Sequence, residues 1–156
     1  MNRINKTDYY LDIAETTSKR STCLKRQYGA IIVKDDEVIS SGFNGAPRGV
    51  VSCIETDKCY RVNAKRGTDY CNCVSVHAEQ NAIISAPRSR MIGSTMYLVG
   101  IENHNWYVDN ASPCALCKRM IINAGIEKVV VRINKEEFQV FDVDTWKNSE
   151  SITGGY

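Results

Sequence analysis

The sequence lacks long apolar runs, and it has little excess of either charge. None of its 156 residues lies in a stretch approaching the roughly 18 uninterrupted apolar positions of a membrane span, and the start has no apolar block typical of a secretory signal. We therefore expect a soluble, cytoplasmic protein that contacts no membrane. Lys and Arg number 20 against 18 Asp and Glu, so the chain offers no basic stripe for long nucleic acid, although a small phosphorylated ligand needs none.

The length and composition indicate one globular domain. The chain is 43% apolar and 24% charged, and it shows no internal repeat or low-complexity block. We assign residues 1–147 to a single domain and expect residues 148–156 (NSESITGGY) to form a flexible tail.

Hydrophobic periodicity predicts alternating strands and helices. Thr7 to Lys19 has helical spacing, and two strand-like runs at 28–34 and 37–43, separated by Asp35-Asp36, predict a β-hairpin. Residues 44–70 are rich in Gly, Pro and charge without periodicity, and a loop this long needs something to hold it.

The second half of the chain predicts a strand–helix–strand unit. A helix is expected over 77–86 and a strand over 95–100; a second helix has Ser112 as N-cap, Pro113 at its first position and Gly125 at its end. The strand over 128–132 then follows by a right-handed crossover, which implies parallel pairing, and EEFQVFDV adds a further strand.

The seven cysteines are the most informative residues. An odd number without a secretory signal argues against a disulfide scaffold and for metal or catalytic chemistry. Cys114 and Cys117 stand three apart at a predicted helix start, where thiolates are stabilised, and His77 begins the other helix. Three such ligands with one open position are typical of a catalytic zinc rather than a structural one.

Glu79, two residues after His77, completes the constellation. An open zinc position holds a water whose pKa falls to about 7, and a neighbouring carboxylate can move its proton. Separately, His-x-Glu could be a surface helix start, and Cys-x-x-Cys could be a redox pair or half of a structural zinc site. Together they complete H-x-E…P-C-x-x-C, a pattern of zinc-dependent nucleobase deaminases.

The chain resembles the deoxycytidylate deaminases of the cytidine deaminase superfamily. The matching stretches are RSTCLKRQYGAIIV, SSGFNGAPRGVVSC, VHAEQNAI and SPCALCKRMIINAGI. The resemblance implies an α/β fold, a three-layer α-β-α sandwich with a mixed, about five-stranded sheet. It also implies hydrolysis of dCMP to dUMP and ammonia by attack of zinc-bound hydroxide on C4, with Glu79 as proton shuttle. Homo-oligomers, commonly hexamers, and regulation by dCTP and dTTP occur in the family.

The resemblance also suggests substrate contacts. Asn44 of the FNG motif would fix the sugar and phosphate, and the backbone at Ala111 and Ser112 would receive the amino group. Lys25 and Arg26 are candidates for the 5′-phosphate, although a solvated basic turn is an equal reading.

A second, structural zinc is expected in the long loop. By resemblance we assign it to Cys23, Cys53, Cys59 and Cys73, with Cys71 as the spare thiol and an exchange of Cys71 and Cys73 left open. The alternative is that some of these are plain buried cysteines.

The segment GIENHNWYVDNA, residues 100–111, departs from the family, which has a short connection here. With His104, Trp106 and Tyr107 it could be a lid, a base-stacking wall or a subunit contact; His104 is expected to be an exposed loop residue rather than a metal ligand. The segment leaves the substrate open to a nucleoside, a modified dCMP or tRNA adenosine. A zinc-stabilised binding module without catalysis is the non-enzymatic alternative.

Overall fold

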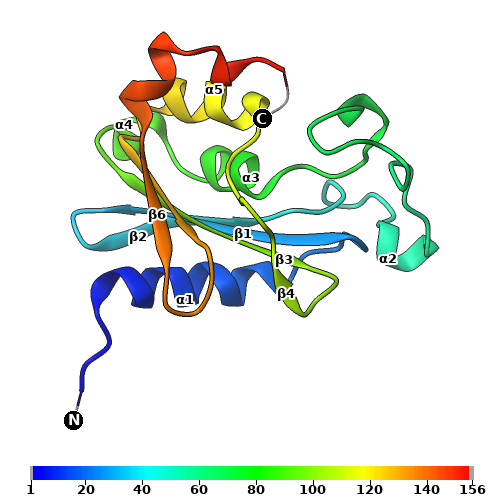
Figure 1. Ribbon diagram of the computed structural model, residues 1–156, viewed down its shortest axis with the longest axis horizontal. Coiled ribbons are helices and arrows are strands. Elements are labelled where there is room, and N and C mark those ends of the chain that lie inside the picture. Colours follow the sequence, from blue (N-terminus) through cyan, green and yellow to red (C-terminus); the bar gives the residue numbers. More distant parts are fainter. Residues whose placement is uncertain (1, 155–156) are drawn as a thin grey trace.

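The computed structural model describes residues 2–154 and places a mixed sheet between two layers of helices (Figure 1). The sheet runs in the order β2-β1-β3-β5-β6, and the short β4 pairs with β3 outside this path. The strands are β1 (Arg26–Lys34), β2 (Glu37–Phe43), β3 (Thr95–Glu102), β4 (Trp106–Tyr107), β5 (Lys128–Arg132) and β6 (Phe138–Asp142). The expected three-layer α/β sandwich is confirmed, with β4 added to the five principal strands.

The helices divide between the two faces of the sheet, α1 on one and α3 and α5 on the other (Figure 1). Their bounds are α1 (Lys6–Ser18), α2 (Cys53–Thr56), α3 (Ala78–Ile84), α4 (Arg88–Met91) and α5 (Ala115–Ala124). The described residues also form three 3₁₀ helices, η1 (Tyr70–Asn72), η2 (Val143–Asn148) and η3 (Glu150–Ile152). None of the helices in residues 2–154 is long and apolar enough to cross a bilayer.

The predicted hairpin and the predicted crossover are both present. Strands β1 and β2 pair antiparallel, and their two-residue connection has positive φ at Asp35 (48°) and Asp36 (65°), the backbone that matches the twist of a hairpin. Strand β3 pairs parallel with β5, and α5 lies in the connection between them. The start of α5 therefore lies beyond the carboxyl end of β3, where open α/β sheets bind ligands.

The core is split by the sheet into two clusters because alternate strand residues face opposite sides. Ile32, Leu98 and Val131 pack toward α3 and α5, whereas Ile31, Val99 and Val130 pack toward α1. Helix α3 approaches the sheet so closely that a Cβ on Gly42 would stand 2.4 Å from the carbonyl oxygen of Ala78. Glycine at this position thus sets the distance between the sheet and the start of α3.

Residues 44–77, the irregular segment, lie at one end of the molecule and contain only the short α2 and η1 (Figure 1). An isolated bridge between Gly45 and Val76 closes the base of the segment. The expected long loop is therefore present.

The end of the chain contacts α5. Lys118 and Arg119 donate hydrogen bonds to the carbonyl oxygens of Ser151 and Ile152, each at 3.3 Å. The domain boundary at residue 147 and the flexibility of residues 148–156 stay predictions, and residues 155–156 lie outside the described residues.

Candidate metal centre and catalytic cavity

His77, Cys114 and Cys117 meet although they are far apart in the chain. The Nδ1 atom of His77 lies 3.5 Å from Sγ of Cys114 and 3.3 Å from Sγ of Cys117. All three ligand atoms lie within 4.8 Å of one another, and no other cluster of three or more potential ligand residues within residues 2–154 meets this limit. The structure thus brings the three predicted ligands together.

The start of α3 positions His77 and Glu79. His77 is the N-cap, and its backbone N–H donates to Oε1 of Gln80 at 2.9 Å, a bond that fixes the chain as it enters the helix. Asn81 donates to the carbonyl oxygen of Phe43 at 2.8 Å and so ties α3 to the end of β2. The first turn of α3 is therefore anchored to the sheet.

The start of α5 differs from the sequence-based expectation. Ser112 and Pro113 were expected as N-cap and first helical residue, but Cys114 is the N-cap and Ala115 begins the helix. The amide of Lys118 donates to the carbonyl of Cys114 at 2.8 Å. The shift places Cys114 at the helix boundary, where its thiol can point past the helix end toward His77, while Gly125 ends the helix as expected (φ 80°).

Hydrogen bonding and charge within the cluster favour one thiolate. The pKa of Cys114 is lowered, first by the hydrogen bond from Cys117 and then by His77, while that hydrogen bond raises the pKa of Cys117. Burial lowers the pKa of His77, but Cys114 and the charge of Glu79 outweigh it and raise the net value. The two cysteines compete for one proton, a situation that a divalent cation resolves by deprotonating both.

The donor set fits zinc. Tetrahedral coordination with Zn–N near 2.0 Å and Zn–S near 2.3 Å separates nitrogen from sulfur by about 3.5 Å, close to the separations of 3.5 and 3.3 Å in the structure. One imidazole and two thiolates are also the ligand chemistry that zinc prefers. Three ligands leave a fourth position for a water or a substrate atom.

Glu79 lies beside this cluster but is not one of its three ligands. Its residue surface is only 5% exposed, and burial raises the pKa of its carboxyl group. A buried carboxylate with a raised pKa accepts a proton more readily than an exposed one, which suits proton transfer.

A cavity of about 130 Å³ opens over the cluster and runs along the irregular segment. His77, Glu79 and Cys114 form its inner end. Four basic residues also line it, and Glu79 is the only acid among the described lining residues. The basic residues are Lys25, Arg26, Arg61 and Arg66. This charge distribution suits an anionic ligand.

Asn44 lies in this cavity with its side chain already bonded to the protein. Its Oδ1 accepts hydrogen bonds from the hydroxyl of Ser21 at 2.7 Å and the amide of Tyr28 at 2.8 Å, while its Nδ2 donates to the carbonyl of Arg26 at 2.9 Å. These contacts fix the orientation of the amide and leave one Nδ2 N–H for a ligand.

Three of the four other predicted substrate contacts line the same cavity as Asn44. Lys25, Arg26 and Ser112 line the cavity, and Ala111 is buried next to Ser112. The guanidinium of Arg26 forms an ion pair with Glu102 at 3.0 Å.

The four cysteines predicted to hold a second zinc face the same cavity. Cys23, Cys53, Cys59 and Cys73 all line it, whereas Cys71 is exposed and does not. Burial, followed by the charges of the other three thiols, raises the pKa of Cys53. The four sulfurs therefore line the same cavity, but within residues 2–154 no three of them lie within 4.8 Å of one another.

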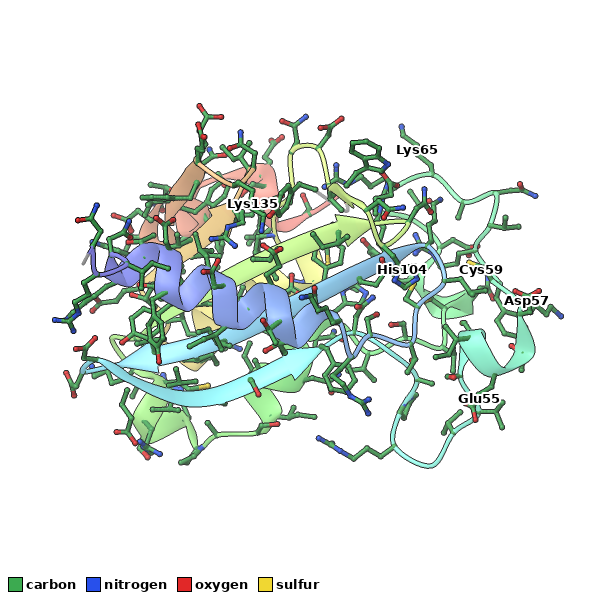
Figure 2. The ribbon with its side chains drawn as sticks, turned by 90° about the horizontal axis from the view of Figure 1, so that it is seen from below. Glu55, Asp57, Cys59, Lys65, His104 and Lys135 are labelled. Atoms are coloured by element: carbon green, nitrogen blue, oxygen red, sulfur yellow. The ribbon has the colours of Figure 1, made fainter. Side chains whose placement is uncertain are left out.

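The 100–111 segment forms the end of β3, a turn and β4. His104 is exposed at the turn, at the same end of the molecule as Cys59 (Figure 2), and does not belong to the described metal-ligand cluster. Trp106 is 73% exposed, and Tyr107 donates a hydrogen bond to Glu15 of α1 at 2.8 Å. Within residues 2–154, no side chain from 100–111 lines the cavity.

Sequence reasoning missed Arg61, Arg66 and Tyr70 as cavity residues. All three lie in the irregular segment, which has no periodicity to show which side chains face inward. Their chemistry was visible in CYRVNAKRGTDY, where three basic residues lie between two tyrosines close to the cysteines.

An α/β sandwich with an open three-ligand zinc site and a buried carboxylate beside it defines a metal-dependent hydrolase of the deaminase type. Residues 4–133 match the family described as the cytidine and deoxycytidylate deaminase zinc-binding region, and the chain belongs to this family.

Relatives and solved structures agree with this assignment. The chain is 34% identical to the deoxycytidylate deaminase of Mycobacterium phage D29 over 83% of this chain and 96% of the relative. It is 35% identical to that of Saccharomyces cerevisiae over 85% of this chain, but spans only 40% of the yeast protein. A crystal structure of cyanophage S-TIM5 dCMP deaminase in complex with dCMP and dUMP matches with a TM-score of 0.58 and 27% identity, covering 83% of this chain and 84% of that one.

Proposed function

We propose that the protein hydrolyses dCMP to dUMP and ammonia. The observation that carries the proposal is the cavity itself, which joins a three-ligand metal site and a buried carboxylate at one end to basic residues along its walls. The deoxycytidylate deaminases similar to this chain support the choice of substrate.

Each group in the cavity has a role in this reaction. Bound by His77, Cys114 and Cys117, zinc would acidify and polarise a water molecule at its free position. Glu79 takes a proton from the water and delivers protons to ring N3 and then to the departing amine. Asn44 binds the sugar end through its remaining Nδ2 N–H, the backbone at Ala111 and Ser112 receives the amino group, and Lys25 and Arg26 add positive potential for the phosphate.

The direct test is turnover of dCMP by zinc-loaded protein, followed by absorbance and by ammonia release. We expect dCMP to be the preferred substrate in a panel with deoxycytidine, 5-substituted dCMP and an adenosine-containing tRNA hairpin. Preference for another member of the panel would replace the substrate, and no turnover of any cytosine compound would point to the non-catalytic zinc module.

We also propose the second, structural zinc at Cys23, Cys53, Cys59 and Cys73. The support is their common position along the cavity wall in a segment with little regular structure. Elemental analysis should give two zinc ions per chain. Cys73→Ser should reduce this to about one, whereas Cys71→Ser, the matched exposed thiol, should leave two. One zinc in the unmodified protein, or equal losses in both variants, would contradict the assignment.

Assembly into homo-oligomers, with hexamers as in the family, and regulation by dCTP or dTTP are proposed on the family resemblance alone. Sedimentation of the purified protein tests the first. Activity measured across a dCMP titration, with and without each triphosphate, tests the second, and unchanged curves would remove it.

A further inference from the structure

The four basic residues of the cavity are not equally available to a ligand. The charge of Arg26 is compensated by Glu102, at 3.0 Å. Both terminal nitrogens of Arg66 donate to backbone carbonyls of the 100–111 segment, to Asp109 at 2.9 Å and Asn110 at 3.0 Å. Lys25 is exposed at the rim. The terminal nitrogens of Arg66 are therefore engaged in holding the protein together, and the charge of Arg26 is already paired with a carboxylate.

Arg61 is held by the protein but keeps donors to spare. Its Nε and Nη2 both donate to the carbonyl oxygen of Thr68, with Nε at 3.0 Å. Within the described part of the chain, Nη1 has no hydrogen-bond partner and no carboxylate forms an ion pair with this guanidinium. Its positive charge is thus uncompensated, and the two N–H groups of Nη1 are available.

Aromatic stacking fixes Arg61 relative to the metal ligands. The guanidinium carbon lies 4.6 Å from the centre of the Tyr70 ring, and the Tyr70 ring meets the His77 ring edge-on with centres 4.9 Å apart. Arg61, Tyr70 and His77 all line the cavity, so the row runs from its wall to the metal ligand. A nucleotide whose base reaches the metal must extend its phosphate away from it, toward the wall.

We propose that Arg61 is the specificity-determining residue for the 5′-phosphate, which it binds through Nη1 while Thr68 and Tyr70 hold the guanidinium in place. This inference rests on the proposed function, because it requires the cytosine ring at the metal end of the cavity. It assigns Lys25 and Arg26 a supporting, long-range role. Loss of Arg61 should therefore remove the preference for a nucleotide over its nucleoside without changing how the base is processed.

The test compares dCMP with deoxycytidine in Arg61→Gln and in matched variants. Calorimetric Kd values, measured in the inactive Glu79→Gln background, give a readout independent of turnover, and kcat and KM are measured in the background that retains Glu79. We expect Kd and KM for dCMP to rise about 30-fold in Arg61→Gln, corresponding to roughly 2 kcal/mol for a charge-assisted pair. All values for deoxycytidine should stay within about twofold. Lys58→Gln removes a cation that lies 4.7 Å from the ring of Tyr60, a lining residue, but Lys58 does not itself line the cavity. This control should leave the Kd values for both ligands unchanged.

Arg61→Lys keeps the charge but has one ammonium that cannot both bond Thr68 and present a fork. The Kd and KM of Arg61→Lys for dCMP should lie between those of the unmodified protein and those of Arg61→Gln. This variant keeps the test valid if the glutamine variant does not fold. Zinc content and melting temperature verify that each variant is intact.

Three outcomes would overturn the proposal. The first is an equal loss of affinity for dCMP and deoxycytidine in Arg61→Gln. The second is a larger loss of affinity for dCMP alone in Arg26→Gln than in Arg61→Gln. The third is equal affinity of the unmodified protein for both ligands. Failure of the proposed function looks different: the protein would bind dCMP more tightly than deoxycytidine, in an Arg61-dependent manner, yet release no ammonia from it.

Discussion

The inner end of the cavity and its outer wall are built in different ways. At the inner end, the metal ligands and Glu79 stand at the starts of α3 and α5, two helices packed on the same face of the sheet. The outer wall comes from the irregular segment, where hydrogen bonds to backbone carbonyls and a cation–ring stack hold side chains such as Arg61. The candidate metal ligands thus stand on regular elements, whereas the proposed phosphate contact lies in an irregular segment, a division common in enzymes.

The largest expected effect tests the inner end. Glu79→Gln should lower kcat for dCMP about a thousand-fold because the amide cannot shuttle protons, while bound zinc stays unchanged. Steady-state kinetics and elemental analysis measure the two quantities. Glu136→Gln, an exposed carboxylate remote from the cavity lining, serves as the control. If activity persists in Glu79→Gln, the carboxylate is not the proton shuttle.

The second prediction compares a glycine beneath α3 with one in the irregular segment. Gly42→Ala would place a Cβ 2.4 Å from the carbonyl oxygen of Ala78, so we expect a loss of about 3 kcal/mol in unfolding free energy, together with reduced kcat as α3 shifts. Gly49 has φ +81° and open space around its Cβ position, so Gly49→Ala should cost only about 1 kcal/mol. Urea unfolding measures both. Similar losses would mean that the sheet contact does not set the position of α3.

The third prediction concerns α1, on the face opposite the site. Lys135 lies over α1 (Figure 2), and Glu15 accepts hydrogen bonds from Tyr107, Arg132 and Lys135 at 2.8, 2.6 and 3.2 Å. Burial raises the pKa of Glu15, but the hydrogen bonds from these three residues outweigh it, so the net pKa lies below its ordinary value of 4.5.

A lowered pKa in the folded state means that the Glu15 carboxylate stabilises the fold above pH 4.5 and loses this effect as the pH falls through the folded value. Glu15→Gln should therefore lower the free energy of unfolding by about 1 kcal/mol at pH 7, with little change in kcat. The free energy of unfolding of this variant should also fall less steeply as the pH is lowered. Urea unfolding from pH 3 to 7 measures this. A fall in kcat larger than the loss of folded protein would show that α1 acts on the site through the sheet.

The smallest effect is expected at the tip of the 100–111 segment. Trp106→Ser should leave kcat/KM for dCMP within about twofold, because the ring is 73% exposed and does not line the cavity. A large fall in kcat/KM would support the lid or base-stacking role that the sequence left open.

Regular periodicity and strong local signals made much of the fold predictable. The hairpin at Asp35-Asp36, the crossover from β3 to β5 and the end of α5 at Gly125 all follow from local chemistry, and the structure confirms them. The predicted start of α5 was wrong by two residues: Ser112-Pro113 is a strong local helix-start signal, but the N-cap in the structure is Cys114. The ligand set could be predicted because few residue types bind zinc and their spacing is specific.

The sequence by itself predicted the order of strands and helices and the candidate ligands His77, Cys114 and Cys117, with Glu79 beside them, because helix and strand periods and the His-x-Glu and Cys-x-x-Cys spacings are properties of nearby residues. The three-layer arrangement was implied by the family resemblance. Only the tertiary structure decided which basic residues are engaged elsewhere, that Arg26 is paired with Glu102 while Arg61 keeps free donors over Tyr70. Those contacts join residues of separate elements or of an aperiodic segment. Local sequence patterns do not predict these contacts, because the distances between such residues depend on how the whole molecule packs.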